Sequence, residues 1–146
     1  MLQAELAQML LNLPAVPLKL DEMLSLLAKI ADERQEHFAV LTLDSGGRLI
    51  NSKVIFIGTV TSTLVHPREI FAQAIADYAV SIVVSHNHPS GNPSPSQQDI
   101  ATTQQLVAAG ILLGINVDDH IIVAGGSHYS FAANGLILPP DLAPIA

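Results

Sequence analysis

The segment that decides the fold reads His86-Asn87-His88-Pro89-Ser90-Gly91-Asn92-Pro93-Ser94-Pro95-Ser96-Gln97-Gln98-Asp99. β-forming residues at 80–85 precede it, so we expect a strand whose alternate side chains project His86 and His88 to one side. Prolines and a glycine then interrupt regular structure as far as Ser96. An acidic residue three positions after Ser96, followed by apolar residues at helical spacing, predicts a helix that carries Asp99 in its first turn. A strand end, a stiff loop and a helix start can therefore bring two imidazoles and a carboxylate together.

Two imidazoles and a carboxylate are ligands that Zn²⁺ accepts, and three protein ligands leave the fourth tetrahedral position open for water. The chain has no cysteine, which excludes thiolate zinc sites, cysteine nucleophiles and disulfides. Of the six histidines, only His86 and His88 stand two apart on a strand-like run. We therefore expect one Zn²⁺ per chain, held by His86, His88 and Asp99, rather than two histidines that serve only the core or the surface.

Ser96 and Asp99 also have a simpler interpretation. The pattern Ser-x-x-Asp resembles a capping box, in which both side chains only satisfy backbone N–H groups at a helix start. A carboxylate committed to zinc has less freedom to cap, so we expect the two roles of Asp99 to compete.

The spacing of these residues resembles a known motif. His-x-His, seven residues and then Ser-x-x-Asp is similar to the JAMM/MPN motif of zinc metallopeptidases, and this version resembles the RadC-like branch. The other segments that carry the resemblance are His86 to Gly91, Pro95-Ser96, His66-Pro67-Arg68-Glu69 and Asp119-His120-Ile121-Ile122-Val123. The resemblance implies an α/β (α+β) JAB/MPN fold, with a mixed β-sheet flanked by helices in a cytidine-deaminase-like layered architecture.

For the site, the resemblance implies zinc bound by His86, His88 and Asp99. It also implies that Glu36 is the general base, acting on the zinc-bound water, and that Ser96 assists the transition state.

The residues alone do not single out Glu36, because a charged residue before an apolar strand is commonly a solvated strand end. Glu33 and Glu69 are its rivals. Glu33 falls at the end of an amphipathic helix, and Glu69 falls in a first helical turn, where an acid interacts favourably with the helix dipole. Glu36 is preferred mainly through the resemblance.

His120 has three interpretations. It can support a metal ligand from behind, replace one of the ligands, or be a strand-end histidine bonded to Asp118 or Asp119. The residues favour the last of these.

These observations predict a zinc-dependent hydrolase of peptide or isopeptide bonds, in which a glutamate takes a proton from a zinc-activated water. The alternative is a non-catalytic, metal-stabilised scaffold or interaction module associated with DNA repair or mobile elements. A third class, phosphodiester hydrolysis, is disfavoured by the single metal and by the charge distribution, because every Lys and Arg lies at or before Arg68. Direct contact with nucleic acid, which depends on such cations, is likewise not expected.

The composition fits a compact domain with a large aliphatic core, since 49% of the 146 residues are hydrophobic. No apolar run reaches the ~18 residues needed to span a bilayer, and the N-terminus lacks the basic region of a secretory signal. We expect a cytoplasmic protein that acts on a peptide or protein substrate and has no membrane partner. The excess of aliphatic residues is consistent with a homodimer.

Periodicity and breakers divide the chain into three parts: a helix and linker at 1–18, a RadC-like JAB/MPN domain at 19–135, and an irregular tail at 136–146. The elements expected in the first half are a helix over 2–13, a core-packing helix over 20–31, and strands at 37–44 and 48–57 joined by Ser45-Gly46-Gly47. Those expected in the second half are a helix from Pro67 with Ile75 and Tyr78 on its apolar side, a central strand at 80–86, a helix over 96–109 ending near Gly110, and strands at 120–124 and 128–132 joined by Gly125-Gly126.

Overall fold

The fold is given by a computed structural model, which describes residues 17–60 and 65–137. The elements are α2 (Leu20–Ala31), β1 (His37–Leu43), β2 (Leu49–Ile57), α3 (Pro67–Ala76), β3 (Ser81–Asn87), α4 (Gln97–Leu113), β4 (Asn116–Ala124) and β5 (Ser127–Ser130). The helix expected over 2–13 lies outside the described residues, as does the expected tail from residue 138 onward.

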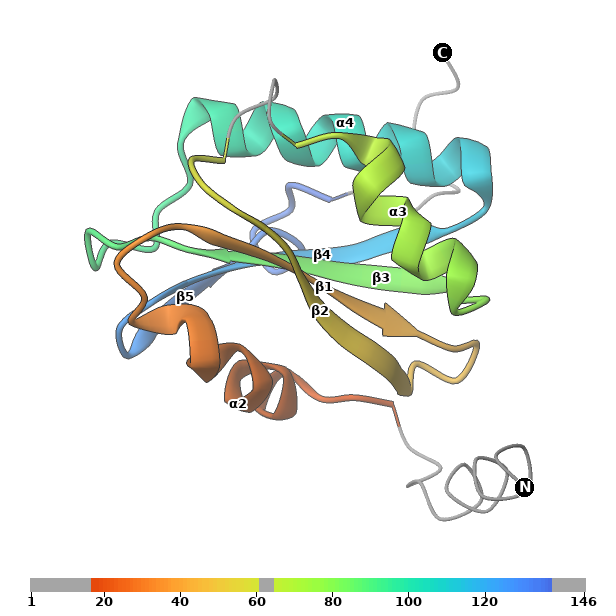
Figure 1. Cartoon of the computed structure of the whole chain (residues 1–146), viewed down its shortest axis with the longest axis horizontal. Helices are drawn as coiled ribbons and strands as arrows, with labels where there is room; N and C mark the ends of the chain where they lie inside the picture. Colours follow the sequence, from red (N-terminus) through yellow and green to blue (C-terminus); the bar gives the residue numbers. More distant parts are fainter. Residues whose placement is uncertain (1–16, 61–64, 138–146) are drawn as a thin grey trace.

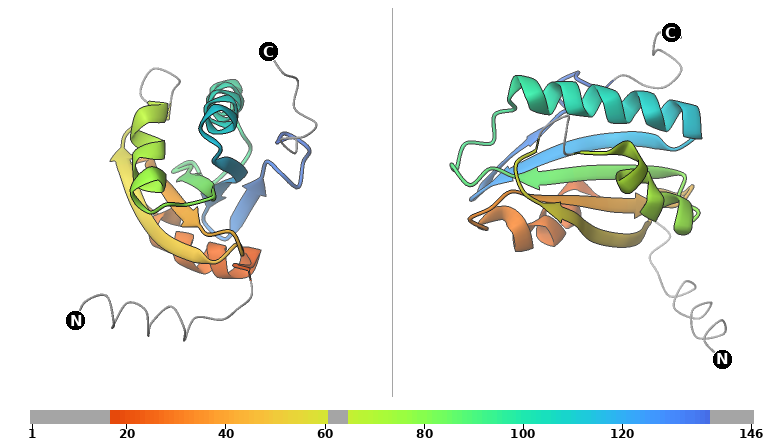
Figure 2. Two further views of the ribbon diagram at one scale, coloured as in Figure 1. Left: turned by 90° about the vertical axis from the view of Figure 1, so that its right-hand side faces the viewer. Right: turned by 45° about the horizontal axis from the view of Figure 1, so that its top comes forward.

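The described strands form one mixed sheet in the order β2-β1-β3-β4-β5 (Figure 1). β3 and β4 run parallel, and the other neighbouring pairs are antiparallel. Helix α2 covers one face of the sheet, whereas α3 and α4 cover the other (Figure 2). The predicted mixed sheet flanked by helices is therefore confirmed.

Each face of the sheet has its own apolar core. On one face the stripe of α2, which includes Leu27 and Ile30, packs against Leu41 and other side chains of β1, β3 and β4. On the opposite face Phe38 and Val84 pack against side chains of α3 and α4. β3 is buried along its whole length, as expected of a strand with helices on both sides.

Helix α4 is longer than the sequence indicates. It was expected to end near Gly110, but it continues to Leu113 and ends at Gly114, whose φ of 73° is left-handed. Gly110 lies inside the helix, where a side chain would collide with the carbonyl oxygen of Ile115. A glycine required for close packing therefore has the same sequence signature as a stop signal. β4 likewise begins at Asn116, four positions before the expected start.

The apolar face of helix α3 contains fewer residues than expected. It ends at Ala76, and Tyr78 follows it with a φ of 53° and an exposed fraction of 92%. The backbone N–H of Ala79 donates to the carbonyl of Ala74, which closes the helix end and turns the chain away from the helix axis. Ile75, inside the helix, is 56% exposed, and Tyr78 lies beyond the helix end, so neither packs on the core, contrary to the prediction. No helix in the described part of the chain is both long and apolar enough to cross a bilayer.

Candidate metal centre

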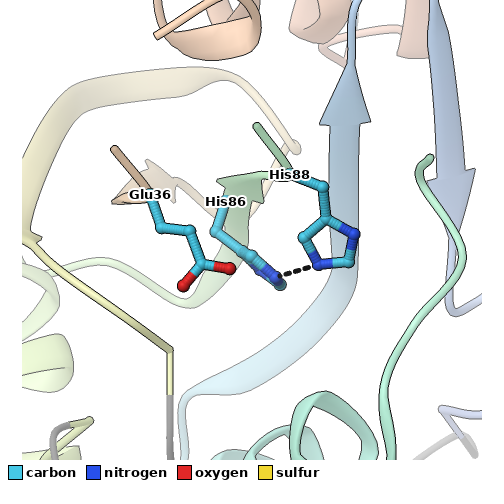
Figure 3. A group of neighbouring side chains, drawn as sticks. All are labelled: Glu36, His86 and His88. Carbon is cyan, nitrogen blue, oxygen red and sulfur yellow. Dashed lines mark hydrogen bonds between the residues drawn. The ribbon is translucent and has the colours of Figure 1, made fainter. Parts of the chain in front are cut away.

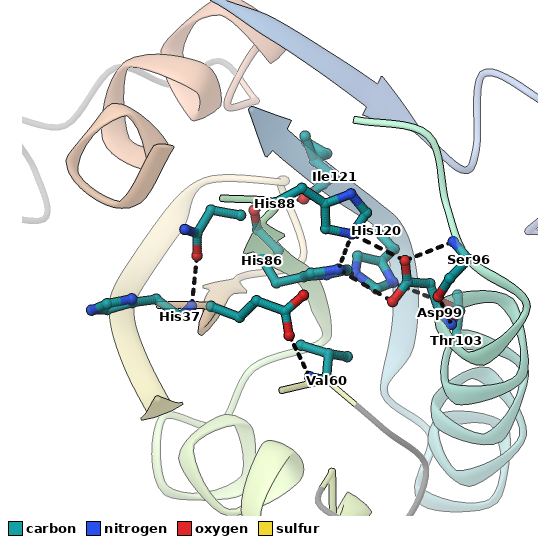
Figure 4. Close-up of polar contacts among 12 residues, drawn as sticks. His37, Val60, His86, His88, Ser96, Asp99, Thr103, His120 and Ile121 are labelled. Atoms are coloured by element: carbon teal, nitrogen blue, oxygen red, sulfur yellow. Dashed lines mark hydrogen bonds and ion pairs between the residues drawn. The ribbon is translucent and has the colours of Figure 1, made fainter. Parts of the chain in front are cut away.

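The site lies where β3 ends and α4 begins. His86 is the second-last residue of β3, and His88 is the first residue after the strand. The backbone N–H of His88 donates to the carbonyl of Val123, which holds it to β4. Asp99 is in the first turn of α4, which approaches from the side (Figure 4). The structure therefore brings together the three side chains that the sequence proposed as ligands.

The donor atoms of these three side chains converge on one point. The two Nε2 atoms of His86 and His88 are 3.0 Å apart. The carboxylate of Asp99 lies 3.3 Å from Nε2 of His86 through Oδ1 and 3.1 Å from Nε2 of His88 through Oδ2. Ligand atoms around a tetrahedral zinc ion, bound at its usual distances, are about 3.3 Å apart. The spacing and chemistry of the donors therefore fit one zinc ion, although their role as ligands stays a prediction.

Glu36 is the acid that the fold places beside the histidines. Single ligand atoms of Glu36, His86 and His88 all lie within 4.8 Å of one another (Figure 3). One carboxylate oxygen of Glu36, Oε2, accepts a hydrogen bond of 2.7 Å from the backbone N–H of Val60. Its backbone carbonyl accepts another, of 2.9 Å, from Gly58. Glu36, rather than Glu33 or Glu69, thus belongs to the group of side chains among the described residues that could hold a metal ion.

The capping box exists and coexists with the histidine contacts. Ser96 Oγ accepts from the N–H of Asp99 at 3.0 Å, and Oδ2 of Asp99 accepts from the N–H of Ser96 at 2.8 Å. The same carboxylate faces both histidines, so the cap and these contacts are compatible, whereas the expected competition between capping and zinc binding stays a prediction. The cap instead fixes the direction in which the carboxylate points. The hydroxyl hydrogen of Ser96 is not used in the cap.

The electrostatics of the site keep Asp99 ionised. Burial works to raise the pKa of Asp99, but its hydrogen bonds with the imidazoles of His86 and His88, and the one from the backbone N–H of Ser96, together hold it far below its ordinary value. The hydrogen bond with Asp99 raises the pKa of His88 above its ordinary value, against a smaller lowering by burial. A permanently ionised carboxylate beside two imidazoles is suited to hold a cation, either a proton or a metal ion.

His120 lies behind His86 and not at the point where the donor atoms meet. Its Nε2 is 2.8 Å from Nδ1 of His86, and its Nδ1 contacts the hydroxyl of Thr103 (Figure 4). Burial lowers the pKa of His120 well below its ordinary value, so the ring is neutral. Asp119 accepts from the backbone N–H of His120 and not from its ring. The favoured interpretation, a histidine ring bonded to a neighbouring acid, is therefore wrong.

The sequence pattern did not reveal Thr103, which contacts His120, or Asn87. Asn87, between the two histidines, points to the opposite side of the strand and is fully buried. Its Oδ1 accepts from the N–H of His37 at 2.6 Å, and its Nδ2 donates to the carbonyls of Glu33 and Gln35. Asn87 thereby ties β3 to the segment that carries Glu36. The only signal in the sequence was its place between the histidines.

A cleft of about 370 Å³ adjoins the site at Glu36. Its walls are formed by Arg34, Gln35, Glu36, Gly58, Thr59 and Pro89. His88 is partly exposed, with 13% of its side chain accessible, whereas His86 is fully buried. Glu36 is therefore shared by the cleft and the site, and His88 is the histidine that solvent reaches.

Comparison with known proteins identifies the class. The model of the RadC-like JAB domain family matches residues 19–136, and the chain belongs to this family. Similar relatives are a UPF0758 protein of Trichodesmium erythraeum, 52% identical over 67% of this chain and 40% of the relative, and one of Pelobacter propionicus, 43% identical over 75% of this chain and 48% of the relative. A UPF0758 protein of Methanococcoides burtonii is 43% identical over 71% of this chain and 45% of the relative. The chain spans about half the length of the curated relatives it matches.

Proposed function

We propose that this domain is a zinc-dependent hydrolase of amide bonds, either peptide or isopeptide. The observation that carries the proposal is the meeting of His86, His88 and Asp99 at one point, with Glu36 beside them at the wall of an open cleft. The JAB/MPN resemblance, which implies zinc peptidases, supports the same reaction class. Cleavage of peptide or protein substrates in the cytoplasm, without direct contact to nucleic acid, is part of this proposal, and a homodimer is compatible with it.

In this proposal His86, His88 and Asp99 hold the metal. Bound zinc would supply a Lewis acid and lower the pKa of water toward ~7. Glu36 takes a proton from the attacking water and later delivers it to the leaving amine. The backbone N–H of Val60 fixes Glu36 for this task by holding Oε2, and leaves the other carboxylate oxygen for proton transfer.

Ser96 is placed to act on the substrate carbonyl. Its oxygen accepts from the N–H of Asp99, so its hydrogen can be donated to the oxygen that gains negative charge in the transition state. Removing one such donor typically raises the barrier by about 2.7 to 4 kcal/mol. The cleft beside Glu36 would bind the part of the substrate on one side of the bond that is cut.

The scaffold alternative has less support from the geometry. Structural zinc sites are closed by four protein ligands, whereas catalytic sites keep one position open. Here a glutamate tied by a backbone hydrogen bond, and the cleft that it lines, lie beside three candidate ligands. A purely structural metal needs neither feature.

The test compares Glu36→Gln with the parent in a library of peptides and isopeptides, screened with and without a chelator. We expect the variant to keep stoichiometric zinc, measured by elemental analysis, and to lose about 10²- to 10⁴-fold in turnover of any substrate that the parent cleaves. Glu33→Gln is the matched control and should retain both. Unchanged turnover in Glu36→Gln would remove Glu36 as the base. A zinc-loaded parent that cleaves no library member would favour the scaffold.

A further inference from the structure

A chain of buried hydrogen bonds runs from the start of α4 to the back of His86. The hydroxyl of Thr103 donates to the backbone carbonyl of Asp99 at 2.7 Å. The oxygen of Thr103 also contacts Nδ1 of His120, and Nε2 of His120 is 2.8 Å from Nδ1 of His86. Thr103, His120 and His86 are all shielded from solvent, so water does not compete for these groups.

The direction of each hydrogen bond follows from the chemistry of its members. A threonine hydroxyl has one hydrogen, and Thr103 gives it to a carbonyl, which can only accept. Thr103 must therefore accept from His120, so Nδ1 of His120 carries the hydrogen. A neutral imidazole has only one N–H, which leaves Nε2 of His120 as an acceptor. His86 must then donate from Nδ1, and its Nε2 lone pair points at Asp99 and His88.

His88 reaches the same state by a shorter route. Its Nδ1 is 2.8 Å from the backbone carbonyl of Asn92, which can only accept, so Nδ1 carries a hydrogen and the neutral ring has its lone pair on Nε2. In the neutral rings both Nε2 atoms thus direct their lone pairs toward each other and toward the Asp99 carboxylate. A proton in this place makes the hydrogen bonds with Asp99, and a metal ion would take its position. Such a group of acceptors is stable only around a cation.

We propose that Thr103 and His120 are positioning residues that lock His86 in the tautomer whose Nε2 can bind the metal. The inference rests on the proposed zinc site and deepens it. Helix α4 supplies the ligand Asp99 and, one turn later, the hydroxyl that sets the tautomer of another ligand. Outer residues that orient histidine ligands typically change metal affinity by about 10- to 100-fold when they are removed.

The test uses two neighbouring threonines of α4. Thr103→Val keeps the shape of the side chain and removes the hydroxyl that accepts from His120. The neutral ring of His120 then favours a hydrogen on Nε2, where it faces Nδ1 of His86. Two N–H groups cannot share one hydrogen bond, so His86 moves its own hydrogen to Nε2, the atom that would bind the metal. Thr102→Val is the matched control, because Thr102 is equally buried and its hydroxyl has no hydrogen-bond partner among the residues that the structure describes.

Two readouts are measured on the full chain. Zinc affinity, from competition with a chromophoric chelator, should fall about 10- to 100-fold in Thr103→Val and stay at the parent value in Thr102→Val. Long-range ¹H–¹⁵N correlation spectra of ¹⁵N-histidine protein should show Nδ1–H on His120 in the metal-free parent and Nε2–H in Thr103→Val. His120→Phe, which keeps an aromatic ring between Phe38 and Phe131, should lower zinc affinity to a similar degree.

The outcomes separate this inference from the proposed function. Parent-like zinc affinity in a folded Thr103→Val, or an equal loss in Thr102→Val, would overturn the role of Thr103 and His120 while zinc binding itself stands. A parent that binds no zinc would overturn the proposed function. In that case the tautomer of His120 still decides the inference, because Nε2–H in the metal-free parent contradicts the deduced chain and Nδ1–H supports it.

Discussion

Two helices of this domain begin with the same local plan but differ in what their first turns do. In α3 the N-cap is His66 and the third helical residue is Glu69, whereas in α4 the N-cap is Ser96 and the third helical residue is Asp99. Glu69 is exposed, and Asp99 is 2% exposed. Both acids interact favourably with a helix dipole, but only Asp99 faces two imidazoles. The position in the first turn sets the interaction with the helix dipole, and the element packed against the helix sets the chemistry.

The largest effect expected from this comparison is on metal binding. Asp99→Asn keeps an oxygen for the cap but removes the charge that faces His86 and His88, so zinc affinity should fall by more than the ~100-fold typical of outer residues. Glu69→Gln should leave zinc affinity at the parent value. Both affinities can be measured by chelator competition. If the two variants lost zinc equally, the comparison between the helices would fail.

A second test measures how much the hydrogen bonds of Asn87, behind the site, contribute to stability. Asn87→Ala removes the side chain that pairs with three partly buried backbone groups of the Glu33 to His37 segment. The carbonyl of Gln35 keeps its contact with Nδ1 of His37, and each of the other two groups costs about 1 to 3 kcal/mol if it stays unsatisfied. The free energy of unfolding from urea titration should show a large loss. Asn51→Ala, on the exposed side of β2, is the control and should change stability by less than about 0.5 kcal/mol. Equal stabilities would mean that Asn87 does not hold this segment.

The smallest expected effect concerns the two caps alone. Ser96→Ala removes a side-chain oxygen that accepts from Asp99, which should cost about 0.5 to 2 kcal/mol of stability. His66→Ala should cost less, because His66 makes no side-chain capping hydrogen bond. Thermal unfolding of the metal-free proteins compares the two directly. A larger loss in His66→Ala would reverse the ranking of the caps.

The elements of this fold could be predicted where the pattern is periodic and unambiguous. The stripe of α2, the hairpin between β1 and β2, and the buried run of β3 were all visible. The end of α4 was not, because Gly110 is required by the close approach of Ile115 and not by a helix end. The exposed place of Tyr78 was also hidden, since a helical spacing does not reveal where the chain turns away.

The candidate site divides in the same way. The spacing of His86, His88 and Asp99 along the chain was enough to propose a metal centre, because a strand and a helix start have fixed side-chain directions. Glu36 needed the family resemblance, Asn87 had no signal beyond its place between the histidines, and Thr103 had none. Their partners lie in segments distant in sequence or are backbone groups, which a side-chain pattern does not record.

The sequence by itself determined the donor types, their spacing and the cap that directs Asp99, because these depend on local backbone geometry and on the chemistry of each side chain. Only the tertiary structure decided that Glu36 joins the histidines, that Asn87 holds its segment, and that His120 stands behind His86. Those relations depend on the pairing of β1 and β4 with β3, which brings residues distant in the chain within hydrogen-bonding distance.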